Sequence, residues 1–232
     1  MTKKIHIIIV AAGSGSRFGG PLPKQFCDLG GKPVLMRAIE SCRGVLPGTG
    51  MTLVLSEEML DYWHMLCDTL QFDSPDITVG GDTRFESVRR GLATVEPGTD
   101  IIMVHDGARP FPTRAIFHAL VEALEDKKCH GAIPAISVTD SLRKLTADKS
   151  SSTAVDRSDY RAVQTPQAFQ AKLLLEANAK AAKEDLAYTD DASVMEAAGY
   201  ARLCLVPGDV RNIKITNPGD LALANFYLHD FV

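Results

Sequence analysis

Short apolar runs alternate with amphipathic segments along most of the chain. The apolar runs have the length of buried strands, and the segments between them place apolar residues three and four positions apart, as helices do. This alternation predicts an α/β fold with a Rossmann-like, mainly parallel sheet covered by helices. The predicted strands are residues 5–11, 52–55, 77–79, 101–105 and 131–136, and the predicted helices are 34–42, 57–70, 84–94 and 113–127.

One segment breaks the alternation. Residues 138–145 and 153–155 are extended runs around the polar turn 148–152, which predicts a protruding β-hairpin arm at about 137–160. Because a hairpin cannot bury an apolar face alone, we expect the second subunit of a homodimer to cover it, with packing on its own core as the alternative. The pattern resumes with helices at 172–183 and 191–198, strands near 202–206 and 213–215, and a last helix from 218.

Length, charge and cysteine content further limit the possible classes of protein. A length of 232 residues suits a single domain over 1–232. With a formal net charge of -4, the chain has no overall attraction for nucleic acid, and no apolar stretch approaches the roughly 18 residues that a membrane span requires. The five cysteines are scattered and form no C-x-x-C pair, which argues against a disulfide framework or a zinc site and favours the reducing cytoplasm.

The loop after the first strand, residues 11–25, combines glycines with cations. In open parallel sheets ligands lie at the carboxyl ends of the strands, and glycines let backbone N–H groups approach an anion. Arg17 and Lys24, in a segment stiffened by Pro21 and Pro23, suit a nucleoside triphosphate. The spacing is neither that of a P-loop nor of a dinucleotide fold. The alternative is a surface loop with solvated cations.

Longer motifs narrow these options. Ala-Ala-Gly-x-Gly-x-Arg followed by Pro-Lys-Gln resembles the signature of sugar and alcohol-phosphate nucleotidyltransferases, and the whole span 5–228 resembles the 2-C-methyl-D-erythritol 4-phosphate cytidylyltransferase family. The resemblance implies transfer of CMP from CTP to a polyol phosphate in non-mevalonate isoprenoid synthesis, with release of pyrophosphate and Mg²⁺ as cofactor. The further motifs that carry it are Val104-His-Asp-Gly-Ala-Arg-Pro110, Val155-Asp-Arg157, Gln164-Thr-Pro-Gln167 and Asn212-Ile-Lys-Ile-Thr216.

The resemblance also implies roles for single residues. Arg17 and Lys24 would bind the triphosphate and the transition state, while Arg157 and Lys214 would position the acceptor phosphate. Arg157 and Ser141 would come from the partner's arm; the family commonly has Thr in place of Ser141. The nucleotide would lie against Ala11, Ala12, Gly13, Gly15, Gly81, Asp82 and Ser87, and the acceptor against Asp106, Arg109, Ser141 and Thr165. Gly107 stands where the family commonly has Ala, a change that we expect to matter little.

Each candidate also has a structural explanation. Asp106 follows a strand, where a carboxylate can bind Mg²⁺ or a substrate hydroxyl, or else cap a turn. Lys214 sits between two isoleucines, where period-two alternation would make it an ordinary solvated lysine. Arg109 could pair with a local carboxylate instead of facing a pocket, and Asp156 and Arg157 could form a surface pair.

Two other polar features are interpreted as structural. His105 has no Ser or Cys partner in the sequence and is interpreted as packed and hydrogen-bonded rather than catalytic. Thr189-Asp190-Asp191 indicates an N-cap and an acidic first helical turn.

Three rival functions stay open at this point. Ribitol-5-phosphate cytidylyltransferases share the nucleotide motifs, but the Val-Asp-Arg arm favours methylerythritol phosphate. A non-catalytic nucleotide-binding protein would keep Arg17 but have little need for Lys24, Arg157 and Lys214 together. A Rossmann dehydrogenase is the weakest rival, because no acidic residue ends the second strand, which runs into Ser56.

Overall fold

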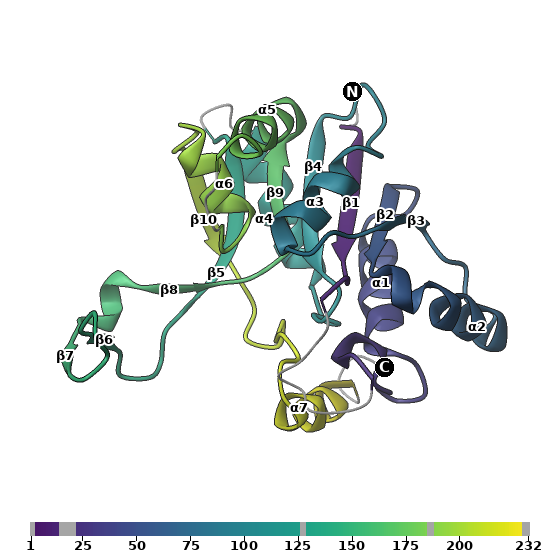
Figure 1. Cartoon of the computed structure of the whole chain (residues 1–232), viewed down its shortest axis with the longest axis horizontal. Coiled ribbons are helices and arrows are strands. Elements are labelled where there is room, and N and C mark those ends of the chain that lie inside the picture. The colour runs from purple at the N-terminus through teal and green to yellow at the C-terminus, as the bar shows by residue number, and fades with distance from the viewer. Residues whose placement is uncertain (1–2, 14–21, 126–128, 185–187, 229–232) are drawn as a thin grey trace.

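A single twisted sheet forms the centre of the molecule. The computed structural model describes residues 3–13, 22–125, 129–184 and 188–228, and in this part of the chain eight strands join in the sheet. Their bounds are β1 (Ile5–Val10), β2 (Gly50–Leu55), β3 (Asp76–Val79), β4 (Ile101–Asp106), β5 (Gly131–Ser137), β8 (Arg161–Val163), β9 (Gln167–Gln170) and β10 (Leu203–Pro207). Their order is β10-β5-β9-β4-β1-β2-β3, and β8 pairs with β5 (Figure 1).

Strand direction confirms the predicted fold class. The pairs β1–β2, β1–β4, β2–β3 and β5–β10 are parallel. Only β8 and β9, neither of which was predicted, run antiparallel to their neighbours. β9 lies between β4 and β5, and its residues before Gln170 are buried although the strand has only four residues. In β9 the two apolar residues, Ala168 and Phe169, are adjacent, so the strand shows no period-two alternation in the sequence.

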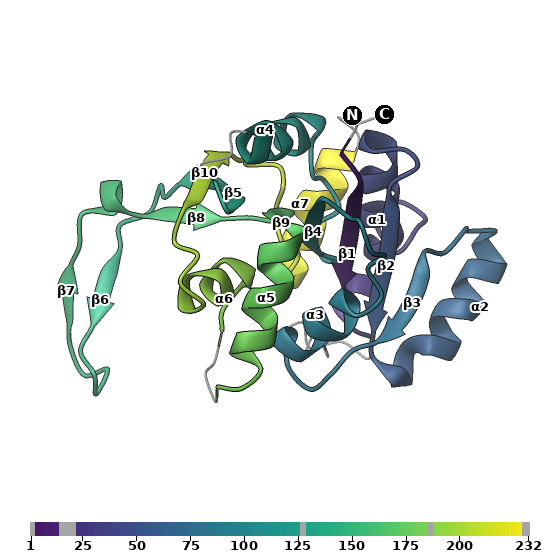
Figure 2. The ribbon, with the colours of Figure 1, turned by 90° about the horizontal axis from the view of Figure 1, so that it is seen from above.

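Helices cover both faces of the sheet (Figure 2). Along β1, Ile7 and Ile9 point to one face and Ile8 to the other, as the alternation of a strand requires. Each is fully buried, which stabilises the fold by about 1.5–3 kcal/mol per side chain. One face is covered by α1 (Val34–Val45), α2 (Leu60–Leu70) and α4 (Arg114–Glu125), and the other by α3 (Arg84–Leu92), α5 (Ala171–Ala181) and α6 (Asp191–Ala197).

The predicted hairpin is confirmed. β6 (Arg143–Leu145) and β7 (Ser152–Ala154) pair antiparallel in a separate two-stranded sheet, and η4 (Arg157–Asp159) follows them. The arm extends away from the sheet (Figure 1). Leu145 is 57% exposed, so the core of its own chain does not cover the arm.

Residues 213–215 correct one prediction, because they form no strand. Ile215 is fully buried among Leu29, Phe111 and the last helix, α7 (Pro218–Leu228). Its N–H donates to the carbonyl of Ala108 at 2.9 Å. The two isoleucines therefore alternate because they pack under α7, and not because they belong to a sheet. A smaller correction is that predicted helix 57–70 consists of η3 (Glu57–Met59) and α2.

The cysteines require a second correction. Cys129 and Cys204 form a disulfide bridge although 75 residues separate them. Parallel pairing of β5 with β10 places Gly131 beside Leu203, which brings the two cysteines together. Spacing along the chain carries no trace of this proximity. Cys27, Cys42 and Cys67 have free thiols.

The described helices also bear on membrane insertion. None of them combines the length and the apolar composition that crossing a bilayer requires.

Candidate active site

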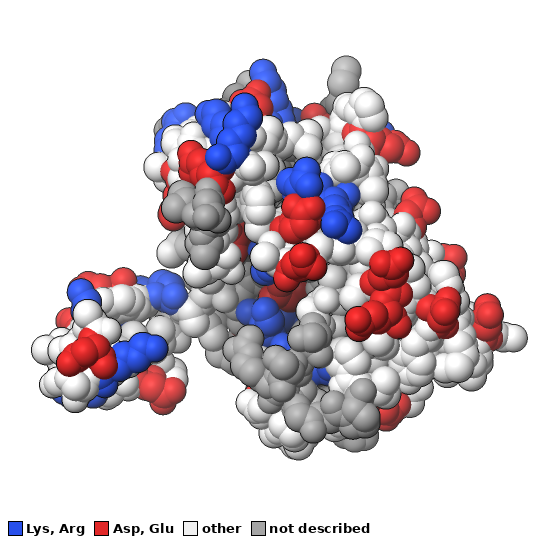
Figure 3. All heavy atoms as spheres, viewed as in Figure 1, with Lys and Arg blue, Asp and Glu red and all other residues white. Residues whose placement is uncertain are grey.

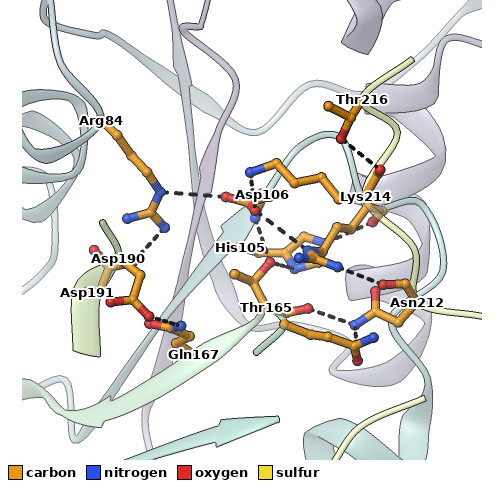
Figure 4. A network of polar contacts seen from close by, with 12 residues as sticks. Arg84, His105, Asp106, Thr165, Gln167, Asp190, Asp191, Asn212, Lys214 and Thr216 are labelled. Carbon is orange, nitrogen blue, oxygen red and sulfur yellow. Dashed lines mark hydrogen bonds and ion pairs between the residues drawn. The ribbon is translucent and has the colours of Figure 1, made fainter. Parts of the chain in front are cut away.

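Asp106, the last residue of β4, lies at the centre of a cluster of charged side chains (Figure 4). Its Oδ2 is 2.8 Å from Lys214 Nζ and 3.6 Å from Arg109 Nε. Its Oδ1 is 3.7 Å from Arg84 Nε. Figure 3 shows charged side chains of both signs gathered in the middle of this face. The structure thus brings together three of the predicted site residues, Asp106, Arg109 and Lys214, and adds Arg84.

The three cations keep the Asp106 carboxylate ionised. Burial alone would raise its pKa, but the charges of Lys214, Arg84 and Arg109 outweigh burial and hold the pKa well below its ordinary value. Lys214 is therefore not the solvated lysine that period-two alternation suggested. Burial lowers the pKa of Arg109, whose side chain is only 11% exposed, and Asp106 opposes that shift.

Thr165, another predicted site residue, holds the end of β4 in place. Its Oγ1 accepts a hydrogen bond from the Asp106 N–H at 2.9 Å and lies 3.1 Å from His105 Nδ1. His105 Nε2 is 2.9 Å from the Arg109 carbonyl, which can only accept, so Nε2 carries the proton and Nδ1 accepts from Thr165. Burial lowers the pKa of His105 to about 4. His105 is packed and hydrogen-bonded, as predicted.

Asn212 was not predicted as a site residue, and it fixes the loop that carries Lys214. Its carbonyl accepts from Arg109 Nη1 at 2.8 Å, and its Nδ2 donates to the Thr165 carbonyl at 2.9 Å. Gln164 adds a contact from Oε1 to the same Nδ2 at 3.3 Å. The side chain is fully buried. Only its place in the motif beside Lys214 distinguished it in the sequence.

A cleft of about 820 Å³ lies beside this cluster at the carboxyl ends of β1 and β3. Gly80 lets two walls of the cleft approach closely, since a Cβ there would lie 2.4 Å from the Ala12 Cβ. Buried Gln25 fixes the first loop by donating to the carbonyls of Ala11, at 2.7 Å, and Gly13, at 3.0 Å. The predicted nucleotide-binding residues on the cleft wall are Ala12, Gly13, Gly81, Asp82 and Ser87, and Arg84 lies on the same wall.

The remaining predicted residues of the nucleotide side have different positions. Ala11 is buried beneath the cleft, and Lys24 begins η2 (Lys24–Phe26), directly after Pro23 on the wall. Gly15 and Arg17 lie outside the described residues. A larger hollow of about 1000 Å³ lies at the amino ends of β1 and β2, opposite the end where parallel strands present ligands.

Gly107 corrects an expectation about substitution. A Cβ at this position would lie 2.7 Å from Leu35 Cδ1 and 3.1 Å from the Ala11 Cβ. Alanine would therefore require the end of the Leu35 side chain to move and Ala11 to yield by a few tenths of an ångström. In this chain the glycine matters to the packing under the cleft.

Two predicted residues lie apart from the cluster. Arg157 and Ser141 belong to the arm, where Arg157 Nη1 donates to the carbonyl of Thr139. The arm projects away from the carboxyl ends of β1 and β4 (Figure 1). Within one chain these side chains do not meet Asp106 or Lys214.

The chemistry of the site suits Mg²⁺ only in part. The Asp106 carboxylate contacts all three cations, and its Oδ1 is 3.7 Å from Arg84 Nε, which is longer than a hydrogen bond. Mg²⁺ commonly uses one or two carboxylates together with phosphate oxygens, so one such oxygen fits a nucleotide-borne ion. Among the described residues no group of three His, Cys, Asp or Glu side chains could hold a metal without such help.

Comparisons agree with the geometry. The family model for IspD, 2-C-methyl-D-erythritol 4-phosphate cytidylyltransferase, matches residues 5–230. The enzyme of that name from Phocaeicola vulgatus is 47% identical over 220 residues, with 94% of this chain and 97% of the relative covered. Its counterpart from Bacteroides fragilis is 43% identical, with 95% and 98% covered.

Solved structures give the same answer. The 4-diphosphocytidyl-2C-methyl-D-erythritol synthase from Anaerococcus prevotii superposes with a TM-score of 0.81 at 28% identity, covering 98% of this chain and 99% of the other. The cytidylyltransferase from Thermus thermophilus gives 0.75 at 28% identity, covering 96% and 98%.

A Rossmann-like sheet with a cationic cluster beside a glycine-lined cleft fits a nucleotidyltransferase, the class of the relatives just given. With the matches just given, the class narrows to enzymes that use a cytidine nucleotide. The chain belongs to the 2-C-methyl-D-erythritol 4-phosphate cytidylyltransferase family.

Proposed function

We propose that this chain transfers CMP from CTP to 2-C-methyl-D-erythritol 4-phosphate and releases pyrophosphate. The observation that carries the proposal is the position of Arg84, which lines the glycine-walled cleft and also contacts Asp106 in the cluster with Lys214 and Arg109. A nucleotide in the cleft would thus have its phosphates beside a cation-rich pocket for a second phosphate.

The balance of charge supports an anionic acceptor. Arg109 and Lys214 share one carboxylate, that of Asp106, whereas Arg84 is balanced by Asp191 and also lies near Asp190. This leaves one net positive charge on the Lys214 side of the partly buried cluster. Such a cluster attracts phosphate more strongly than the same charges in water would. The acceptor phosphate is the group that Lys214 and Arg109 would bind.

The reaction needs no general base. A phosphate oxygen of the acceptor attacks the α-phosphorus of CTP, a new P–O bond forms, and the bond to the β-phosphate bridging oxygen breaks, so that pyrophosphate leaves. Because the nucleophile is already anionic, positioning and neutralisation of charge suffice. Lys24 and Arg17 would neutralise the triphosphate, and Lys214 would orient the acceptor. Mg²⁺ bound to the CTP phosphates would supply further charge neutralisation, with Asp106 as its protein ligand.

A homodimer forms the second half of the proposal. The uncovered arm supports it, since Leu145 and Tyr160 of the arm are exposed, as is Val163 of the adjoining β8. A partner's arm would bring Arg157 and Ser141 to the acceptor side of this site. We place the enzyme in the cytoplasm, where CTP is available.

Pyrophosphate release tests the acceptor. The purified chain is supplied with CTP, Mg²⁺ and either methylerythritol phosphate or ribitol 5-phosphate under the same conditions. We expect turnover with methylerythritol phosphate and little with ribitol phosphate. The reverse preference would overturn the proposal, and CTP binding without turnover on either acceptor would favour a non-catalytic nucleotide-binding protein.

A further inference from the structure

Arg84 lies between two carboxylates that belong to different parts of the fold (Figure 4). Its Nη2 donates to Asp191 Oδ2, at the start of α6, at 2.7 Å. Its Nε is 3.7 Å from Asp106 Oδ1, which is longer than a hydrogen bond. The guanidinium is therefore bound to Asp191 and only near Asp106.

The difference between the distances from Arg84 to its two carboxylates matters for one oxygen of Asp106, Oδ1. Lys214 and Arg109 both lie nearest to Oδ2. Arginine favours a bidentate contact with a carboxylate, so an Arg84 without Asp191 would close on Asp106 and occupy Oδ1. Held by Asp191, Arg84 leaves Oδ1 without a described hydrogen bond.

Asp191 is well placed to act as an anchor. Its side chain is 3% exposed, and the turn that carries it is fixed twice. Asp190 caps α6 by accepting from the Ser193 N–H at 2.9 Å. Gln167 of β9 donates to Asp190 Oδ2 at 2.9 Å and accepts from the Ala192 N–H at 3.1 Å. The anchor is thereby tied to the centre of the sheet.

We propose that Asp191 is a positioning residue that restrains Arg84, so that Asp106 Oδ1 stays available to the nucleotide cleft. The inference rests on the proposed function, because it assigns Asp106 a ligand on the nucleotide side, whether a ribose hydroxyl or the metal carried by the phosphates. Asp191 itself touches no substrate. The acidic turn that suggested only a helix cap thus has a second role.

Three variants test the restraint. Asp191→Asn keeps the shape and removes the charge, and we expect kcat/KM for CTP to fall about tenfold or more. Adding Arg84→Gln removes the guanidinium that would close on Asp106, so Arg84→Gln/Asp191→Asn should regain part of that loss, although the cleft then lacks the Arg84 guanidinium. Arg89→Gln is the matched control and should leave turnover unchanged, because exposed Arg89 lies on the same helix and pairs with partly buried Glu86 rather than with Asp106 or Asp191.

If Asp191 had a purely structural role, a second substitution at Arg84 would not restore kcat/KM. Recovery in the double variant therefore indicates that Asp191 restrains Arg84. The proposal is overturned if Asp191→Asn stays within twofold of the unaltered chain, or if the double variant is no better than Asp191→Asn. Should Asp191→Asn unfold at the assay temperature, the double variant decides alone: its Kd for CTP with Mg²⁺, by calorimetry, must lie within about threefold of the unaltered chain.

The same calorimetry separates this inference from the proposed function. If the unaltered chain binds CTP but turns over neither acceptor, the proposed reaction fails. Even then, the CTP affinities of Asp191→Asn and the double variant, compared with that of the unaltered chain, support or overturn the proposed restraint of Arg84 by Asp191.

Discussion

Lys214 illustrates how a single residue can have one appearance in the sequence and another in the fold. Between two isoleucines it looks like a solvated lysine, yet its Nζ is 2.8 Å from Asp106 Oδ2. The reason is that Ile215 is drawn under α7 and hydrogen-bonded to Ala108, which turns the neighbouring lysine toward the end of β4.

Replacing Lys214 tests its role toward the acceptor. Lys214→Ala should lower kcat/KM for the acceptor about a hundredfold, an effect of the size seen when one charge-stabilising donor is removed. The Kd for CTP should change little. Lys172→Ala, an exposed lysine on α5, serves as control. A variant of Lys214 with an unchanged acceptor KM and kcat would remove it from the site.

His105 permits a prediction of pH dependence. Its pKa is about 4 in the fold against an ordinary 6.5, so the unfolded chain takes up the proton first as pH falls. The stabilisation from neutral His105 is fully present above pH 6.5 and is lost between 6.5 and 4, at up to about 1.4 kcal/mol per pH unit.

Urea unfolding at several pH values between 7 and 4 measures this slope. His105→Gln should unfold with a flatter pH dependence in that window. In the NMR spectrum of the unaltered chain, one imidazole signal should stay unchanged down to about pH 4.5, and this signal should be missing from the spectrum of His105→Gln. Equal slopes for the two proteins would contradict the assignment.

At the level of elements, the edge of the sheet depends on a covalent tie. The disulfide joins Cys204 of β10 to Cys129, directly before β5, and β10 leads into the loop that carries Asn212 and Lys214. The tie therefore supports the outer side of the acceptor pocket as well as the strand pair.

Thiol titration tests the disulfide. In denaturant without reductant, three thiols should react, and all five should react after reduction. Reduction should lower the free energy of unfolding by about 2–4 kcal/mol because it releases a long loop. The same reductant should not destabilise Cys204→Ser further. Five reactive thiols before reduction would show that the bridge does not form.

At the level of the whole molecule, the proposed dimer accounts for the position of Arg157. Arg157 lies on the arm, away from Asp106 and Lys214, and bonds there to the Thr139 carbonyl. A two-fold dimer uses the same surface twice, so each arm would complete the partner's site.

Mixing two inactive variants tests this arrangement. Lys24→Ala and Arg157→Ala should each lose activity, and subunits mixed after dissociation should regain about a quarter of the sites, because half of the dimers are mixed and one of their two sites is intact. Light scattering should show a dimer in each case. No recovery from mixed dimers would place Arg157 outside the partner's site.

The local pattern of the chain determined most of the elements and the glycine loop, since helical and strand periodicity and turn chemistry are properties of neighbouring residues. It also placed Asp106 at a strand end, and the motifs singled out Lys214 and Thr165. Only the tertiary structure decided that β9 lies between β4 and β5, that Cys129 meets Cys204, and that Asp191 binds Arg84. These contacts join residues 36 to 107 positions apart, whose proximity depends on strand order and on the packing of α6 against the sheet, and neither is encoded in the period of any one segment.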